Sequence, residues 1–179
     1  MVHQQDPCGL MVFGEKVSAS LPARSRRSQI SEVLSLLVKT EAAGMSDIPA
    51  SLMQIGGMLR HRSLLMVFSD LLAEPSAIRN ALLRLRHRNH DIILFHVLDE
   101  AEVRFPFQGM VELTDPESSQ RMVVDADAAR RDYVHGVEEF RDHYRQMCQQ
   151  AGIDYVPLDT SMPFDAALME YLINRQQRA

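Results

Sequence analysis

Three acidic positions beside apolar segments are the residues of this sequence best suited to chemistry. Asp70 follows the apolar run 64–69, Asp99 follows the apolar run 92–98, and Ser46-Asp47 precedes a helical pattern. Carboxylate and hydroxyl oxygens are ligands for hard cations such as Mg²⁺. Each position also has a structural explanation, because Asp70 could be a capping or loop residue and Ser46-Asp47 could cap a helix.

Other kinds of chemistry have little support in the sequence. It contains neither GxGxxG nor GxxxxGK[ST], so no phosphate-binding loop is indicated, and no GxSxG nucleophile motif occurs. The two cysteines, Cys8 and Cys148, lack partners at zinc-ligand spacing. His96 falls inside an apolar run, which indicates a core histidine with satisfied hydrogen bonds. Asp70 and Asp99 together leave a metal-assisted hydrolase open as an alternative.

The strands that must position these residues are predicted from apolar runs and alternation. The runs 64–69 and 92–98 read as strands buried on both faces. The segment 111–125 reads as a hairpin, and the polar segment 22–27 reads as a loop. Further strands are predicted at 8–13, 17–21 and 154–158.

Helical spacing of apolar residues predicts the remaining elements. One helix begins after Ser28, which could cap it, and Gly152 is expected to end the long helix 127–149. Other helices are predicted around 52–59, 78–85 and 164–175. Alternating strands and helices are typical of a doubly wound, mostly parallel α/β sheet with flanking helices, here with a hairpin insertion near 111–125. Ligands in such sheets bind at the carboxyl ends of the strands.

Composition limits the class of protein. The chain has 179 residues, 46% hydrophobic and 24% charged, which suits a single globular domain spanning 1–179. A net charge of -5 argues against a nucleic-acid binder, because phosphate neutralisation requires surplus Lys and Arg. No apolar run is long enough to span a bilayer, and few cysteines favour a reducing, cytoplasmic setting.

Several segments, in order, resemble a bacterial family of von Willebrand factor A-like proteins catalogued as domain of unknown function 58. The run RSLLMVFSD at 62–70 resembles the R-S-L-(apolar)-S-D strand of that family. The other matching segments are DPCGLMVF at 6–13, HDII at 90–93, VLDEAE at 97–102, FPFQG at 105–109 and LTDPE at 113–117. The resemblance therefore extends through nearly all of the chain.

The resemblance implies a von Willebrand A-type sheet, in which a metal-ion-dependent adhesion site commonly binds Mg²⁺ or Mn²⁺. Asp70 matches the third-loop Asp of that site, and Ser46 stands where the family has Thr. The DxSxS part of the site occurs nowhere in the sequence. Because these cations require several oxygen ligands, the resemblance implies an incomplete site with weak or no metal binding.

The missing motif also has a structural implication. In the family, the DxSxS strand lies upstream of the segment matching 6–13, so we expect the chain to lack the first central strand and first helix. The strands 8–13 and 64–69 should then either pair directly or leave an open gap. A further expectation is a homodimer through the open sheet edge.

Taken with the resemblance, these residues favour a non-enzymatic protein-interaction module over a hydrolase. Relatives of the family are thought to act with MoxR-type AAA+ ATPases, which implies such an ATPase as the protein partner. Asp99 and Glu102 would lie near the partner-binding surface, beside Asp70 and Ser46.

Overall fold

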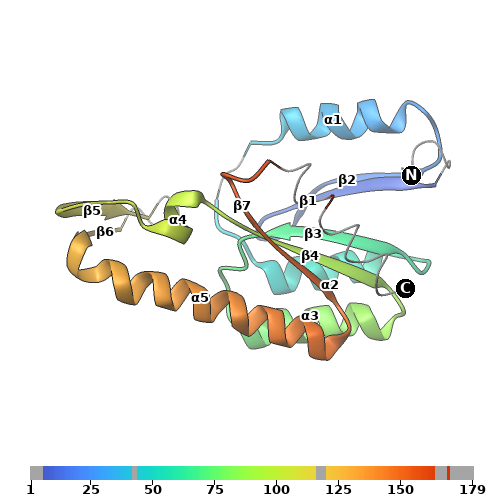
Figure 1. The fold of residues 1–179 in the computed structure, drawn as a ribbon. Coiled ribbons are helices and arrows are strands. Elements are labelled where there is room, and N and C mark those ends of the chain that lie inside the picture. The colour runs from blue at the N-terminus through green and yellow to red at the C-terminus, as the bar shows by residue number, and fades with distance from the viewer. Residues whose placement is uncertain (1–5, 42–43, 116–119, 164–168, 170–179) are drawn as a thin grey trace.

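The computed structural model describes residues 6–41, 44–115, 120–163 and 169, and Figure 1 shows their arrangement. These residues form a mixed α/β fold with a parallel sheet and flanking helices. In chain order the elements are β1 (Cys8–Phe13), β2 (Val17–Arg24), α1 (Gln29–Lys39), α2 (Ile48–Met58), β3 (Leu64–Ser69), α3 (Pro75–His87), β4 (Asp91–Leu98), α4 (Glu100–Arg104), β5 (Met110–Thr114), β6 (Arg121–Asp125), α5 (Ala126–Ala151) and β7 (Asp154–Asp159).

The parallel sheet has the strand order β3-β4-β7. Helix α3 connects β3 to β4, and the long helix α5 precedes β7, so each parallel pair has the helical crossover that it requires. The central strand β4 is buried over most of its length, as its continuous apolar run predicts.

Strand β3 is an edge strand, and the prediction that it is buried on both faces is wrong. Val67 is only 8% exposed, whereas Leu64, Met66 and Phe68 on the opposite face are 38%, 40% and 46% exposed. In the described part of the chain, β3 pairs with β4 on one side and has no strand on the other. The apolar run is therefore an edge strand that is covered on one face only.

Strands β1 and β2 form a separate antiparallel hairpin, so of the two expected arrangements the structure has the gap between β1 and β3. The hairpin reaches Arg24, so the predicted loop at 22–27 is partly wrong. The side-chain amide of Gln29 explains the extension, since Nε2 donates to the carbonyls of Cys8 (2.7 Å) and Pro22 (2.8 Å). These bonds hold the two strand ends together where the ladder is irregular.

The helix ends follow local capping chemistry. The Asp47 side chain accepts from the amide of Ala50 (2.9 Å) at the start of α2, which confirms its capping role. Glu74 caps α3 in the same way by accepting from the amide of Ala77. Ser28 stands at the N-cap of α1 but makes no side-chain cap bond, so that expectation is wrong; its hydroxyl donates to Glu32 instead. Gly152 ends α5 in the left-handed conformation, as predicted.

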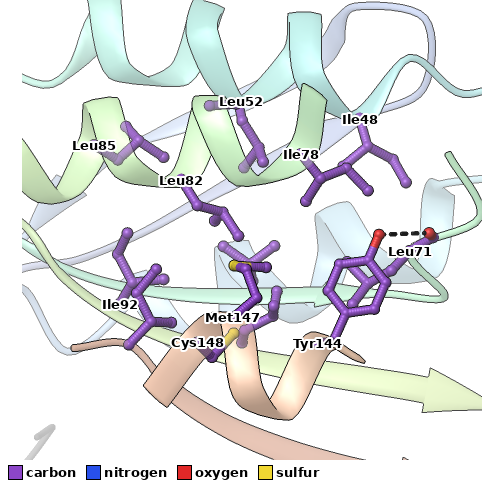
Figure 2. Close-up of a cluster of buried hydrophobic side chains, with 14 residues drawn as sticks. Ile48, Leu52, Leu71, Ile78, Leu82, Leu85, Ile92, Tyr144, Met147 and Cys148 are labelled. Atoms are coloured by element: carbon purple, nitrogen blue, oxygen red, sulfur yellow. Dashed lines mark hydrogen bonds between the residues drawn. The ribbon is translucent and has the colours of Figure 1, made fainter. Parts of the chain in front are cut away.

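The main core lies between the sheet and the helices α2, α3 and α5 (Figure 2). Leu82 of α3 and Leu94 of β4 are fully buried at its centre. Tyr144 and Cys148 of α5 close the core from below in this view, and both are also fully buried. Burial raises the pKa of the Cys148 thiol to about 12, so this thiol stays protonated and serves as a small apolar side chain.

A hairpin of β5 and β6 projects from the body of the fold beside the first turns of α5 (Figure 1). Its register pairs Val111 with Val124 and Thr114 with Arg121, which confirms the hairpin predicted at 111–125. The predicted helix at 164–175 lies outside the described residues except for 169.

Candidate interaction site at the carboxyl end of the sheet

The loop after β3 places Asp70 at the carboxyl end of the sheet, as predicted. Ser69 accepts from the amide of Leu71 through its hydroxyl oxygen (3.1 Å), and Asp70 accepts from the amide of Leu72 through Oδ1 (3.3 Å). These two short-range bonds fold the chain tightly where the strand ends. Asp70 remains exposed, so its carboxylate is presented to solvent from a fixed backbone.

Leu71 is the anchor of this loop. Its φ of 60° lies in the left-handed region, which is unusual for a residue with a branched side chain, and the side chain is fully buried. The hydroxyl of Tyr144 donates to the Leu71 carbonyl (3.3 Å; Figure 2), and the amide of Ala73 donates to the same oxygen (2.8 Å). A strained residue persists only where its surroundings determine its conformation, so the Asp70 loop is rigidly mounted.

His96 lies directly behind this loop, paired with Ser69 in the ladder. It is 1% exposed, which confirms a core histidine, and Nδ1 is 2.7 Å from the hydroxyl of Tyr155. Nε2 makes no well-formed hydrogen bond within the described residues, so the expectation of a fully satisfied histidine is wrong. Burial lowers the pKa of His96 to about 4, although a backbone interaction with Asp70 acts in the opposite direction.

Ser46 lies in a shallow depression beside the same loop. The residues lining this depression come from the β1–β2 turn, the segment before α2 and the start of α3: Glu15, Met45, Ser46, Asp47, Pro49, Ala73 and Glu74. Ser46 therefore lies near Ala73 and Glu74, which follow Asp70 in the chain, whereas Asp70 itself does not line the depression. Three of the lining residues are carboxylates, so this surface, which we call the acidic depression, is negatively charged.

Asp99 and Glu102 form a capping box at the start of α4. Asp99 accepts from the amide of Ala101 (2.8 Å) and from the hydroxyl of Thr160 (2.9 Å), while Glu102 accepts from the amide of Asp99 (2.8 Å). Both oxygens of Asp99 are therefore engaged in joining β4, α4 and the end of β7. Asp99 and Glu102 therefore stabilise the start of α4. Their role in binding a partner stays a prediction.

The donor set does not fit a tightly held divalent cation. Among residues 6–41, 44–115, 120–163 and 169, no three His, Cys, Asp or Glu side chains gather closely enough to hold a metal ion. Asp47 and Glu74 are committed to helix amides, and Asp70 already accepts from Leu72. Because Mg²⁺ and Mn²⁺ require near-octahedral oxygen ligation, these residues do not fit a site for either cation.

The residues that support the Asp70 loop from behind were not predictable from sequence patterns. Tyr144 and Leu71 are separated by 73 positions, and a left-handed leucine has no sequence signature. The acidic depression was likewise missed, since Glu15, Asp47 and Glu74 come from three different elements. The capping role of Asp99 was missed because the short helix α4, which begins after Asp99, was not predicted.

Comparisons with known proteins bear on the family and the fold. No helix in the described parts of the chain has both the length and the apolar character to cross a membrane. A search of curated proteins finds no match. The fold is similar to a structure titled "Crystal structure of conserved hypothetical protein BatB from Bacteroides thetaiotaomicron", with a TM-score of 0.56, 11% identity, and coverage of 99% of this chain and 83% of that chain. Residues 1–143 match the sequence profile of a family, so the chain belongs to the family described as protein of unknown function DUF58.

Proposed function

We propose that this chain is a non-enzymatic protein-interaction module of the von Willebrand factor A type that acts in the cytoplasm. The partner that we propose is a MoxR-type AAA+ ATPase, as the family resemblance implies. The observation that carries the proposal is the acidic depression beside a rigidly mounted loop at the carboxyl end of the parallel sheet. In parallel α/β sheets, this end is where ligands bind.

The charge of the acidic depression favours a basic group on the partner. Glu15, Asp47 and Glu74 line it, and its hydroxyl is that of Ser46. Carboxylates form their strongest hydrogen bonds with Arg and Lys, so an Arg or Lys side chain is the group that this surface would accept. Such a contact differs from the adhesion-site mechanism, in which a bound metal coordinates a carboxylate of the partner.

The mounting of the loop favours binding over catalysis. Leu71 is held by Tyr144 and Ala73, and the adjacent strand end is packed against His96, so the surface is already ordered before a partner arrives. Pre-organisation of this kind reduces the entropic cost of association. No observation favours the hydrolase alternative, because both oxygens of Asp99 are engaged and no metal-ligand cluster occurs in the described residues.

The test is the affinity of the chain for a MoxR-type AAA+ ATPase, measured by biolayer interferometry with and without EDTA. Glu15→Gln removes one charge from the acidic depression without removing a helix cap. It should weaken binding about 5-fold, the effect of one partly exposed ion pair. Glu138→Gln, on an exposed part of α5, is the matched control and should bind like the wild type.

Two results would count against this proposal. Equal affinities for wild type and Glu15→Gln would remove the acidic depression from the interface. Loss of binding in EDTA, restored by Mg²⁺, would instead favour metal-mediated contact through Asp70 and Ser46.

A further inference from the structure

The projecting hairpin of β5 and β6 is an unusual structure for a single chain. A two-stranded hairpin is marginally stable in water unless further strands or a helix cover it. Here Met122 and Val123 of β6 are each 60% exposed, and Met110 of β5 is 69% exposed. Apolar side chains on a projecting sheet with unpaired edges are typical of a surface that pairs with another chain.

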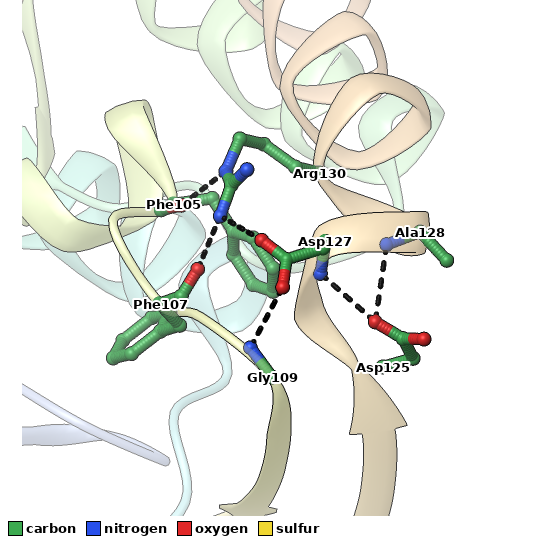
Figure 3. Close-up of polar contacts among 7 residues, drawn as sticks. All are labelled: Phe105, Phe107, Gly109, Asp125, Asp127, Ala128 and Arg130. Atoms are coloured by element: carbon green, nitrogen blue, oxygen red, sulfur yellow. Dashed lines mark hydrogen bonds and ion pairs between the residues drawn. The ribbon is translucent and has the colours of Figure 1, made fainter.

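The base of the hairpin is nevertheless held firmly against α5 (Figure 3). Arg130 donates to the carbonyls of Phe105 (3.3 Å) and Phe107, and it pairs with Asp127 (3.0 Å). Asp127 in turn accepts from the amide of Gly109 (2.9 Å), and these contacts lower the pKa of its carboxyl group. The hairpin is therefore presented in a fixed direction.

The alternation of hydrogen-bonded pairs along the hairpin identifies which backbone groups of β6 make no ladder bond within the described residues. The amide of Asp115 donates to the Gln120 carbonyl, and the amide of Ala126 donates to the Gly109 carbonyl. Between these two positions, hydrogen-bonded and non-hydrogen-bonded residue pairs alternate along the two strands. Met122 and Val124 consequently bond to β5. The backbone groups of Arg121, Val123 and Asp125 point to the outer edge of β6.

We propose that this outer edge of β6 pairs with the same edge of a second copy of the chain, antiparallel and centred on Val123. Each Val123 then exchanges N–H···O=C bonds with its counterpart, and each Asp125 amide donates to the partner copy's Arg121 carbonyl. Two hairpins become one four-stranded antiparallel sheet around a two-fold axis.

Charge complementarity selects this edge and this register. With Val123 at the centre, Arg121 of one copy lies directly opposite Asp125 of the other, and opposite charges in such positions are stabilising. Asp125 uses Oδ1 to cap α5, accepting from the amides of Asp127 (3.1 Å) and Ala128 (3.2 Å), and neither amide uses Oδ2. Arg121 already pairs with Glu112 (3.0 Å), and its guanidinium group has further donors for the second carboxylate.

The other free edges fit a second copy less well. Self-pairing of β5 places Glu112 opposite Glu112, and like charges in that position are destabilising. The edge strand β3 contributes Val67 to the main core, against which Phe13 of the β1–β2 hairpin also packs. We therefore place the homodimer contact at the outer edge of β6 and not at the open sheet edge expected from the sequence.

The test is sedimentation equilibrium of the full chain over a wide concentration range. A five-residue strand pair buries less than a standard interface, so we expect a dissociation constant on the order of 100 µM. Val123→Pro removes the central cross-copy donor but no bond to β5, and proline is tolerated at such edge positions. It should weaken dimerisation about 30-fold, since one donor is lost from each copy.

Two further variants make the measurement specific. Glu112→Pro places the same residue at the equivalent outward position of β5. It releases Arg121 from its ion pair with Glu112 but leaves the backbone donors and acceptors of β6 unchanged, so it should not weaken the dimer. Arg121→Asp sets Asp opposite Asp and should weaken the dimer at least about 10-fold. Far-UV circular dichroism of each variant checks that the fold is retained.

Three results would overturn the proposal. The first is a chain that stays monomeric at the highest concentrations, and the second is equal weakening by Val123→Pro and Glu112→Pro. The third is a dimer unaffected by both Val123→Pro and Arg121→Asp, which would place the contact at another edge.

Discussion

Lowering the pH should destabilise the fold through His96, and replacing this residue should remove a defined part of that sensitivity. Burial holds the pKa of His96 at about 4, below the ordinary value of 6.5. The folded state therefore binds this proton more weakly than the unfolded state. The contribution of neutral His96 to the free energy of unfolding is fully present above pH 6.5 and is lost as the pH falls toward 4. At about 1.4 kcal/mol per pH unit, this interval corresponds to a loss of about 3 kcal/mol in the free energy of unfolding.

The measurement is urea unfolding of wild type and His96→Phe at a series of pH values across that interval. Phenylalanine fits the aromatic surroundings, in which Phe140, Tyr144 and Tyr155 contact the imidazole ring. The variant should be less stable at neutral pH, because the bond to Tyr155 is lost, but its stability should fall less steeply on acidification. Equal steepness in wild type and His96→Phe would refute the reasoning, since all other titrating groups are common to both.

Two further predictions concern the loop anchor and the glycines. Tyr144→Phe removes only the hydroxyl that donates to Leu71, so urea unfolding should show a loss of about 1 kcal/mol, and wild-type stability would show that the bond contributes nothing. Gly9→Ala should destabilise the chain, because a Cβ atom at this position would lie 2.7 Å from the Leu21 carbonyl oxygen. Gly136→Ala in α5 should stabilise the chain by up to about 1 kcal/mol, because its Cβ atom would meet no atom within 4 Å and alanine has the higher helix propensity. Thermal melting of the two glycine variants checks this contrast, and shifts in the same direction would contradict it.

The elements were largely predictable because their signals are local. The strand 92–98 is an apolar run interrupted only by His96, and the structure buries it from both sides. The run 64–69 has the same character, yet it became an edge strand, since burial of a strand depends on its neighbours and not on its own residues. Pro22 looked like a loop residue because the bond that holds its carbonyl comes from Gln29, in the following helix, and Arg24 because its ladder partner is Cys8, at the start of β1.

The candidate site was predictable only in part. Asp47 was recognised as a helix cap from its type and position, and Asp70 was expected at a strand end. The residues that fix this loop were not predictable, because Tyr144 reaches Leu71 across 73 positions of the chain. The clamp formed by Arg130 was missed for the same reason, since its carbonyl acceptor in Phe105 lies 25 positions away.

The separation of the β1–β2 hairpin from the parallel sheet has a consequence for folding. In the described residues the two sheets share no ladder, and the hairpin is bonded instead to α2 and its N-cap. The Gly14 carbonyl accepts from the Asp47 amide (3.0 Å) and the Ser51 hydroxyl (3.0 Å), and the Val17 amide donates to the Gln54 side chain (3.0 Å). The hairpin pairs residues close in sequence, so it forms early, whereas β7 pairs with β4 only after the loop through α5 closes. We therefore expect the hairpin to be a separate cooperative unit, able to open and reclose while β4 stays protected from exchange with solvent.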